Sequence, residues 1–291
     1  MARRTIGVAT CASAPDLDED GSVLLAALSD TGADPQPGVW DDPDVDWVGL
    51  DGVLVRSTWD YPLRRGAFLA WAGTPRVIAN PYDVLAWNTD KRYLQDLASA
   101  GVATVPTLFL PPGRALPEPH GECVVKPTVS GSAADTGRFP DLADPAAAAL
   151  VARLHGQGRA VMVQPYLPQI EVDGETSLVF LGGRYSHAVR REPLLTGLGE
   201  RRPVVVADVL GSVRQVQPTP DQRDLAERAL SAVPGGRERL TYARVDVIPG
   251  PDGPVLLELE ATDCFLFLSL ATSTATATMA EHVLERLRQQ P

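Results

Sequence analysis

Charged residues recur at alternate positions in two segments near the end of the chain. Arg244 and Asp246 are two residues apart, and Glu258 and Glu260 follow a loop rich in Gly and Pro at 249–254. Side chains alternate between the two faces of a strand, so each pair is expected to share a face. The loop is typical of a connection between antiparallel strands. A register with Asp246 opposite Glu258 sets Arg244 opposite Glu260, and it gathers three carboxylates on one small surface.

The other face of this predicted hairpin is apolar, because Val245, Val247, Leu257 and Leu259 alternate with the charged residues. Like charges across a strand pair repel, so the acidic face must be hydrated, partly protonated or neutralised by a cation. Carboxylates without His or Cys favour Mg²⁺, which binds through one or two carboxylates and substrate phosphates. We therefore predict a Mg²⁺–nucleotide site; the alternative is an amphipathic hairpin with a hydrated acidic face.

Lys91 is one of two lysines placed where a phosphate could bind. It falls in the first turn of a helix predicted over about 88–98, with Gly101 as its stop signal. A cation at this end of a helix opposes the helix dipole. The position therefore favours an anionic partner over simple solvation of the ammonium group.

The second lysine, Lys126, ends an apolar strand predicted over 122–127. The loop that follows, 128–137, contains Ser130, Gly131 and other small residues, and backbone N–H groups of such a loop can fold over phosphates. Flexible surface loops have the same composition, so the loop by itself is weak support for a phosphate site.

Polar and aromatic residues end a buried strand near the N-terminus. A strand over 5–11, a helical run and a second strand from Gly52 are typical of an α/β region, in which ligands bind at the carboxyl ends of strands. Candidate substrate contacts therefore follow at the end of the second strand, namely Arg56, Ser57, Trp59, Asp60 and Tyr61. The planar guanidinium of Arg56 suits a carboxylate. In the alternative, the aromatic residues pack in the core and the arginine caps a loop.

Two arginines in the middle of the chain are candidates for anion contacts. A strand over 160–167 is followed by an acidic strand over 171–181, which a Gly-Gly turn pairs with a strand over 184–190. Arg190 and Arg191 end this last strand, where they bind an anion or form a solvated pair. Helices are predicted over 145–155, 221–232 and 279–288, and a mobile loop over 194–213.

The composition is that of a globular protein without a nucleic-acid partner. The 291 residues carry a net charge of -11 and no concentrated basic patch. The three cysteines are widely spaced and form no CxxC motif, so each is predicted to be a buried small residue. Neither a signal peptide nor an apolar run long enough for a membrane is found, so we expect a cytoplasmic protein with no membrane partner.

The order of these features resembles the ATP-grasp superfamily over residues 75–270. The features are Lys91, Lys126 with its loop of small residues, the segment from Gln164 to Leu167, and the acidic set of the hairpin. The resemblance implies a mixed α/β and α+β fold that clasps ATP between two α+β subdomains. A preATP-grasp or substrate domain would span 1–87, a small ATP-grasp subdomain 88–160, and a large subdomain with the metal site 161–291.

The resemblance also implies a role for each candidate residue. ATP would contact Lys91, Lys126, Ser130, Gly131 and the hinge residues Gln164, Pro165, Tyr166 and Leu167, with Glu171 or Glu175 on the ribose. Two Mg²⁺ ions would be held by Asp246, Glu258 and Glu260. Arg244 would lie near the transferred phosphate, with Lys126 and Arg190 as further catalytic candidates. The third metal position of the family is commonly Asn, so Glu260 is a departure that changes the surroundings of the second ion.

Two similarities narrow the expected activity. The segment 164–170 followed by Gly174 and Glu175 is similar to the glutathione-synthetase branch, but Ser177 stands where that branch has Arg, so glutathione is not the expected product. The segment 56–61 looks like that of small ligases which include a cycloserine-forming cyclo-ligase.

These similarities imply an ATP-dependent carboxylate–amine ligase that forms a C–N bond through an acyl phosphate and yields ADP and phosphate. The expected substrate is a small amino-acid-like molecule, with ring closure of O-ureidoserine to cycloserine, an antibiotic, as the specific expectation. The alternatives are an intermolecular amino-acid or peptide ligase and a non-catalytic nucleotide-binding protein. The loop 128–137 would cover the acyl phosphate, and a homodimer or homotetramer is expected.

Overall fold

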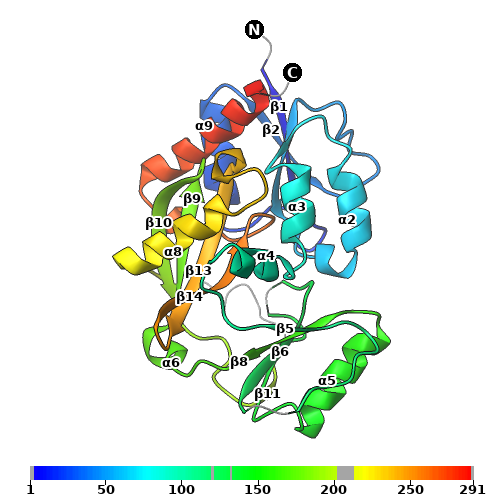
Figure 1. Cartoon of the computed structure of the whole chain (residues 1–291). Coiled ribbons are helices and arrows are strands. Elements are labelled where there is room, and N and C mark those ends of the chain that lie inside the picture. The colour runs from blue at the N-terminus through cyan, green and yellow to red at the C-terminus, as the bar shows by residue number, and fades with distance from the viewer. Residues whose placement is uncertain (1–2, 119–120, 132, 202–212, 290–291) are drawn as a thin grey trace.

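Three β-sheets form the framework of the protein. Figure 1 shows two of them in the upper part of the molecule and the third in the lower part. The computed structural model describes residues 3–118, 121–131, 133–201 and 213–289. Within these residues, no helix has the length and apolar character needed to cross a lipid bilayer.

The N-terminal sheet is parallel and has the strand order β2-β1-β3-β4. Its central strand β3 is buried along its whole length, as is typical of a parallel strand covered by helices on both faces. The elements are β1 (Thr5–Thr10), α1 (Gly21–Asp30), β2 (Asp34–Val39), β3 (Gly52–Ser57), the 3-10 helix η1 (Tyr61–Leu63), α2 (Arg65–Ala72), β4 (Ile78–Ala79) and α3 (Tyr82–Asn88). The predicted α/β arrangement is confirmed.

The lower sheet in Figure 1 is antiparallel, with the order β11-β7-β6-β8-β5 and one covering helix, α5. The helix begins where the Asp144 carboxylate accepts a hydrogen bond from the Ala146 N–H at 2.7 Å. Its Leu150 and Leu154 pack with Val125 of the sheet. The elements are β5 (Leu108–Leu110), β6 (Cys123–Pro127), β7 (Gly137–Phe139), α5 (Pro145–Gly156), β8 (Val161–Pro165) and β11 (Gly199–Glu200).

The third sheet has the order β12-β10-β9-β13-β14 and is covered on both faces. Successive residues of β9 face opposite sides, so Leu178 and Phe180 pack with α8 while Val179 and Leu181 pack with α9. The elements are α4 (Tyr93–Ser99), α6 (Ile170–Asp173), β9 (Glu175–Leu181), β10 (Arg184–Arg191), β12 (Arg214–Val216), α8 (Pro220–Ser231), the 3-10 helix η2 (Arg237–Arg239), β13 (Tyr242–Gly250), β14 (Gly253–Glu260), the 3-10 helix η3 (Leu268–Leu270) and α9 (Ser273–Gln289).

The hairpin of β13 and β14 has the predicted register, with Arg244 opposite Glu260 and Asp246 opposite Glu258. A bulge follows, because the register shifts between Asp246 and Val247. Val247 therefore pairs with Leu256, which is fully buried, and Leu257 lines a cavity instead of the core. The expectation that Leu257 faces the core was wrong because strict alternation stops at a bulge.

Four predicted segments differ from the observed elements. Lys91 lies in the turn between α3 and α4 and not in a helix, because its N–H donates to the Thr128 carbonyl at 2.8 Å. Glu171 belongs to the short helix α6, and Gly174, with a positive φ of 65°, separates this helix from β9. The last helix begins at Ser273, ahead of the predicted start. Of the predicted loop 194–213, residues 199–200 pair with β7, and 202–212 lie outside the described part of the chain.

Asn80 connects the N-terminal sheet to the third sheet. Its Nδ2 donates to the carbonyls of Tyr242 and Ala261, both at 2.8 Å, and its Oδ1 accepts from the Thr241 N–H at 2.7 Å. The residue is fully buried and adopts a left-handed φ of 63°, which Asn tolerates better than most residues. This side chain fixes the hairpin of β13 and β14 relative to the region that follows β4.

Candidate active site

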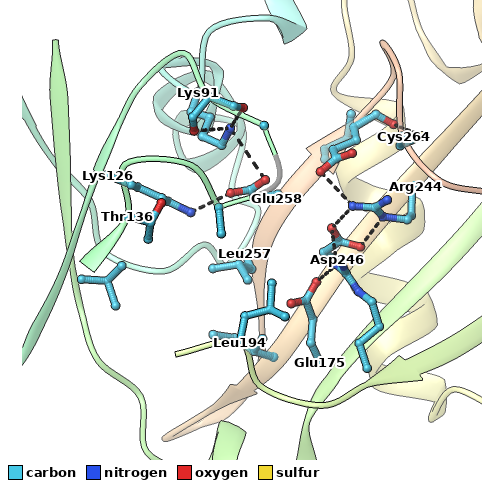
Figure 2. Close-up of a pocket in the computed structure, with 18 of the residues that line it drawn as sticks. Lys91, Lys126, Thr136, Glu175, Leu194, Arg244, Asp246, Leu257, Glu258 and Cys264 are labelled. Carbon is cyan, nitrogen blue, oxygen red and sulfur yellow. Dashed lines mark hydrogen bonds and ion pairs between the residues drawn. The ribbon is translucent and has the colours of Figure 1, made fainter. Parts of the chain in front are cut away.

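A cavity opens where all three sheets approach one another, and Figure 2 shows its polar centre. The N-terminal region contributes Trp59 and Tyr61, and the turn before α4 contributes Lys91. The lower sheet and its loops contribute Lys126, Ser130, Gly131, Gln164, Tyr166 and Leu167. The third sheet contributes Glu175, Arg191, Arg244, Asp246, Glu258 and Glu260. One cavity thus brings together residues that are far apart in the sequence. Each of them was predicted to bind a ligand or is adjacent in the chain to a residue that was.

Two lysines surround Glu258 on one side of this centre (Figure 2). Lys126 Nζ donates to Glu258 Oε1 at 2.6 Å, and Lys91 Nζ lies 3.8 Å from Glu258 Oε2. Lys91 Nζ also donates to the Ser130 carbonyl at 2.8 Å, which holds the start of the 128–137 loop against the turn. Burial alone would raise the pKa of Glu258, but Lys126 and Lys91 outweigh it and lower the pKa to about 2. Glu258 is therefore ionised at neutral pH.

Two arginines surround Asp246 on the other side. Arg244 donates through Nε and Nη2 to the two oxygens of Asp246, each at 2.8 Å, and Nη2 also lies 2.8 Å from Glu260 Oε1. Arg191 lies 3.0 Å from Asp246 Oδ2 and also pairs with Glu175. Against the effect of burial, Arg244 and Arg191 hold the pKa of Asp246 well below its usual range. Burial raises the pKa of Glu175 to about 7, with Arg191 opposing it.

The carboxylates of this centre suit a hard divalent cation by chemistry, although each is turned toward a lysine or arginine. Asp246, Glu258 and Glu260 line the same cavity and offer only oxygen ligands, which is the donor set that Mg²⁺ prefers. As they lie, no three or more His, Cys, Asp or Glu of the described residues are close enough together to hold a metal ion. Metal binding here would require Glu258 and Glu260 to leave their cationic partners.

The apolar part of the cavity lies next to the predicted hinge. Val124, Ile170, Ile248 and Leu257 line it together with three hinge residues, Gln164, Tyr166 and Leu167. Gln164 Nε2 donates to the Thr107 hydroxyl at 3.0 Å, which fixes its side chain. Apolar walls of this kind are suited to an aromatic base.

The observed fold and sequence relationships agree on the family. A family model described as the N-terminal domain of D-cycloserine synthetase DcsG matches residues 6–79. The cycloserine biosynthesis protein DcsG of Streptomyces lavendulae is 34% identical over 303 residues, which span 97% of this chain and 99% of that protein. The chain belongs to the D-cycloserine synthetase family.

Solved structures support the same assignment. The crystal structure of D-cycloserine synthetase DcsG superimposes with a TM-score of 0.87 at 32% identity, over 97% of this chain and 99% of that one. A D-alanine–D-alanine ligase from Bacillus anthracis, solved with ATP, has a TM-score of 0.68 at 14% identity over 98% of both chains, which shows a shared fold. The expected ATP-grasp fold and the enzyme class, an ATP-dependent ligase that forms C–N bonds, are confirmed.

Within this synthetase-family cavity, only two of the five predicted substrate residues, Trp59 and Tyr61, line the wall. Arg56 is fully buried, and its Nη2 donates to Asp18 Oδ2 at 2.7 Å, so it does not meet a cavity ligand directly. The Ser57 hydroxyl lies 3.1 Å from the hydroxyl of Thr10. Asp60 accepts from the Trp40 ring N–H at 2.8 Å and pairs with Arg64. The strand end supplies the aromatic wall, while its polar side chains stabilise the surrounding loops.

The structure also separates candidates that the sequence left together. Arg190 Nη2 donates to the Val172 carbonyl at 2.7 Å and does not line the cavity, whereas the neighbouring Arg191 does. Glu175 lines the cavity, whereas Glu171 lies at the hinge, where it accepts a hydrogen bond from the Tyr166 hydroxyl at 2.8 Å. Pro165 is exposed and not part of the wall, while Ser130 and Gly131 are.

Among the wall residues that were not expected from the sequence, three lie near the carboxylates of the hairpin. Asn88 ends α3, and its side chain donates to the Leu259 carbonyl and accepts from the Ala261 N–H, both at 2.7 Å. Asp263 and Cys264 follow β14 in an irregular segment. Burial raises the pKa of the Cys264 thiol far above its usual range, so this cysteine is no nucleophile. Asp263 and Cys264 lie where no strand or helix period applies, so sequence patterning gave no signal for them.

Proposed function

We propose that the chain closes O-ureidoserine to a ring in an ATP-dependent reaction that leads to cycloserine. The observation that carries the proposal is the arrangement of the cavity. The cavity is lined by two charged clusters and an aromatic pair. One cluster is Lys91, Lys126 and Glu258, the other is Arg191, Arg244 and Asp246, and the aromatic pair is Trp59 and Tyr61. The full-length identity of 34% to a cycloserine biosynthesis protein supports the choice of substrate.

In the proposed reaction, the substrate carboxylate attacks the γ-phosphorus of ATP and gives an acyl phosphate and ADP. The ureido nitrogen bound to oxygen then displaces phosphate and closes a five-membered ring. The ring nitrogen of this product still carries the carbamoyl group. Hydrolysis of that group releases carbon dioxide and ammonia and gives cycloserine, so that all atoms are accounted for. No enzyme nucleophile is required, so the chain contributes positioning and charge neutralisation.

The lysines, the metal-type carboxylates and Arg244 each have a place in this scheme. Lys126, Lys91 and the N–H groups around Ser130 and Gly131 would bind the phosphates, and the hinge would bind adenine, with Glu171 or Glu175 on the ribose. Mg²⁺, when bound by Asp246, Glu258 and Glu260, would neutralise charge on the transferred phosphoryl group. Arg244 Nη2, which already contacts two of these carboxylates, is placed to contact the phosphoryl oxygens as they move. A dry cavity would protect the acyl phosphate from water.

The test is ADP release with Mg²⁺–ATP and each enantiomer of O-ureidoserine, with product masses measured. We expect cycloserine from one enantiomer, and we expect Glu258→Gln to lower kcat at least about 100-fold. Glu281→Gln, on the exposed face of α9, is the matched control and should keep the parental rate. Turnover that requires two different amino acids would replace ring closure with intermolecular ligation. A Glu258→Gln variant as fast as the parent would contradict the assigned phosphate and metal site.

A further inference from the structure

One carboxyl group of the cavity has no partner of opposite charge among the residues that the structure describes. The other charged residues of the wall are paired: Lys91 and Lys126 with Glu258, Arg191 with Glu175 and Asp246, and Arg244 with Asp246 and Glu260. Asp263 lines the same cavity, yet its carboxyl forms no hydrogen bond or ion pair within the described residues. Asp263 is half-buried, and a partly desolvated carboxylate without a cation is costly, so this residue needs an explanation other than packing.

The surroundings of Asp263 include aromatic side chains. Trp59 and Phe265 line the same part of the cavity, with ring centroids 5.2 Å apart. Tyr61 is only 7% exposed, and no described residue hydrogen-bonds to its hydroxyl, which lines the cavity with Asp263. Two polar groups, one acidic and one hydroxylic, thus share an aromatic pocket, and neither has a partner in the described part of the chain.

The charges around Asp263 do not neutralise it. Burial and the nearby Glu260 raise its pKa to about 8, while Arg56, Lys91 and Arg244 lower the pKa by less. Arg56 and Arg244 are already bound to Asp18 and Asp246, respectively. A cation that enters the cavity with the substrate is the missing partner for the Asp263 carboxyl.

We infer that Asp263 binds the ammonium group of an amino-acid substrate and thereby selects amino acids over otherwise identical carboxylic acids. This inference rests on the proposed function and names the feature of the substrate that the site recognises. The Tyr61 hydroxyl supplies a second acceptor for the ammonium group, and the faces of Trp59 and Phe265 favour a cation beside them. Held there, the ammonium group places the neighbouring carboxylate toward Arg244 and the transferred phosphoryl group.

Such a site strongly rejects an analogue without the amino group, because the bound analogue covers the Asp263 carboxyl and leaves it unpaired. We expect the parent protein to prefer O-ureidoserine over 3-(ureidooxy)propanoate, its deamino analogue, by at least about 100-fold in kcat/KM. In Asp263→Asn, this preference should fall below about tenfold, mainly because KM for O-ureidoserine rises. The dissociation constant of Mg²⁺–ATP should stay within about twofold of the parent value, since Asp263 is not placed on the nucleotide.

Binding measurements keep the inference testable without turnover. Titration calorimetry of the parent with O-ureidoserine and with 3-(ureidooxy)propanoate, in the presence of Mg²⁺–ADP, should show the same preference, and Tyr61→Phe should reduce it less than Asp263→Asn does. Equal binding of the two compounds by the parent, or no binding of either, would overturn the inference. So would a variant that lowers kcat with KM and the preference unchanged, because that result assigns Asp263 to proton transfer. If the protein binds O-ureidoserine in preference to its deamino analogue but shows no turnover, only the proposed ring closure is refuted.

Discussion

At the scale of single residues, Asp263 affects the free protein as well as its ligands. A carboxyl group with a folded-state pKa of about 8 binds a proton that the unfolded chain, with an ordinary value near 3.8, has already released. Its contribution to the free energy of unfolding therefore falls as pH rises from about 4 to about 8. The residue required for the substrate ammonium group is thus a source of instability while the cavity is empty.

We expect Asp263→Asn to be more stable than the parent, and increasingly so at higher pH. The gain in Tm over the parent should be at least about 5 °C larger at pH 8 than at pH 5, because only the parent carries the titrating carboxyl. Scanning calorimetry at the two pH values measures this difference. Asp252→Asn, in the exposed hairpin turn, is the control and should show the same Tm difference at both values. A gain that does not change with pH would contradict the raised pKa.

The sequence identified most of the charged cavity residues but not how they pair. Strand alternation sufficed to place Arg244 with Asp246, because both lie in one regular strand. Arg190 and Arg191 are adjacent in a strand and face opposite sides, and nothing in the local sequence indicates which side meets the cavity. Asp263 lies after β14, where no period applies, so its place depends on tertiary packing alone.

At the scale of elements, the bulge in the central hairpin decides which leucine meets a ligand. The paired charges could be predicted because both strands alternate regularly up to Asp246. The bulge could not, since Val255, Leu256 and Leu257 are all apolar and fit either face. Leu257 is partly exposed in the cavity, whereas Leu256 and Leu259 are fully buried.

This difference gives a matched pair of substitutions. Leu257→Ala removes part of the apolar wall, so we expect a roughly five- to tenfold higher dissociation constant for Mg²⁺–ATP with a loss of less than about 1 kcal/mol in stability. Leu256→Ala leaves a cavity in the core and should cost about 2–5 kcal/mol. Urea denaturation and nucleotide titration separate the two effects. Equal stability losses would show that both leucines belong to the core.

At the scale of the whole molecule, Asn80 holds the N-terminal sheet against the hairpin that carries the acidic residues. The α/β order of the first region was predictable from its short apolar strands, and the resemblance extended that order to the rest of the fold. The long-range bonds of Asn80 were not predictable, because they join residues about 160 positions apart in the chain, as the spacing of Asn80 and Thr241 shows.

We expect Asn80→Ala to lose about 2–4 kcal/mol of unfolding free energy, since it leaves two carbonyls and one N–H without their partner and strains a left-handed position. Asn80→Gly, which relieves the backbone strain, should recover about 1 kcal/mol of that loss. Denaturation by urea measures both. A loss below about 0.5 kcal/mol in the alanine variant would show that the two parts hold together without this side chain.

The pairing of charges in the cavity has a consequence for which molecules can enter. The wall carries four cations, Lys91, Lys126, Arg191 and Arg244, and five carboxylates, Glu175, Asp246, Glu258, Glu260 and Asp263. Because these charges nearly cancel, the empty cavity exerts little net attraction on free phosphate or on metal-free nucleotide. A ligand that carries only negative charge binds the lysines and arginines and leaves their carboxylate partners unneutralised. A ligand that carries only positive charge does the reverse. Only ligands that bring both signs, a metal–nucleotide salt and a zwitterionic amino acid, allow every internal pair to be exchanged for an external one.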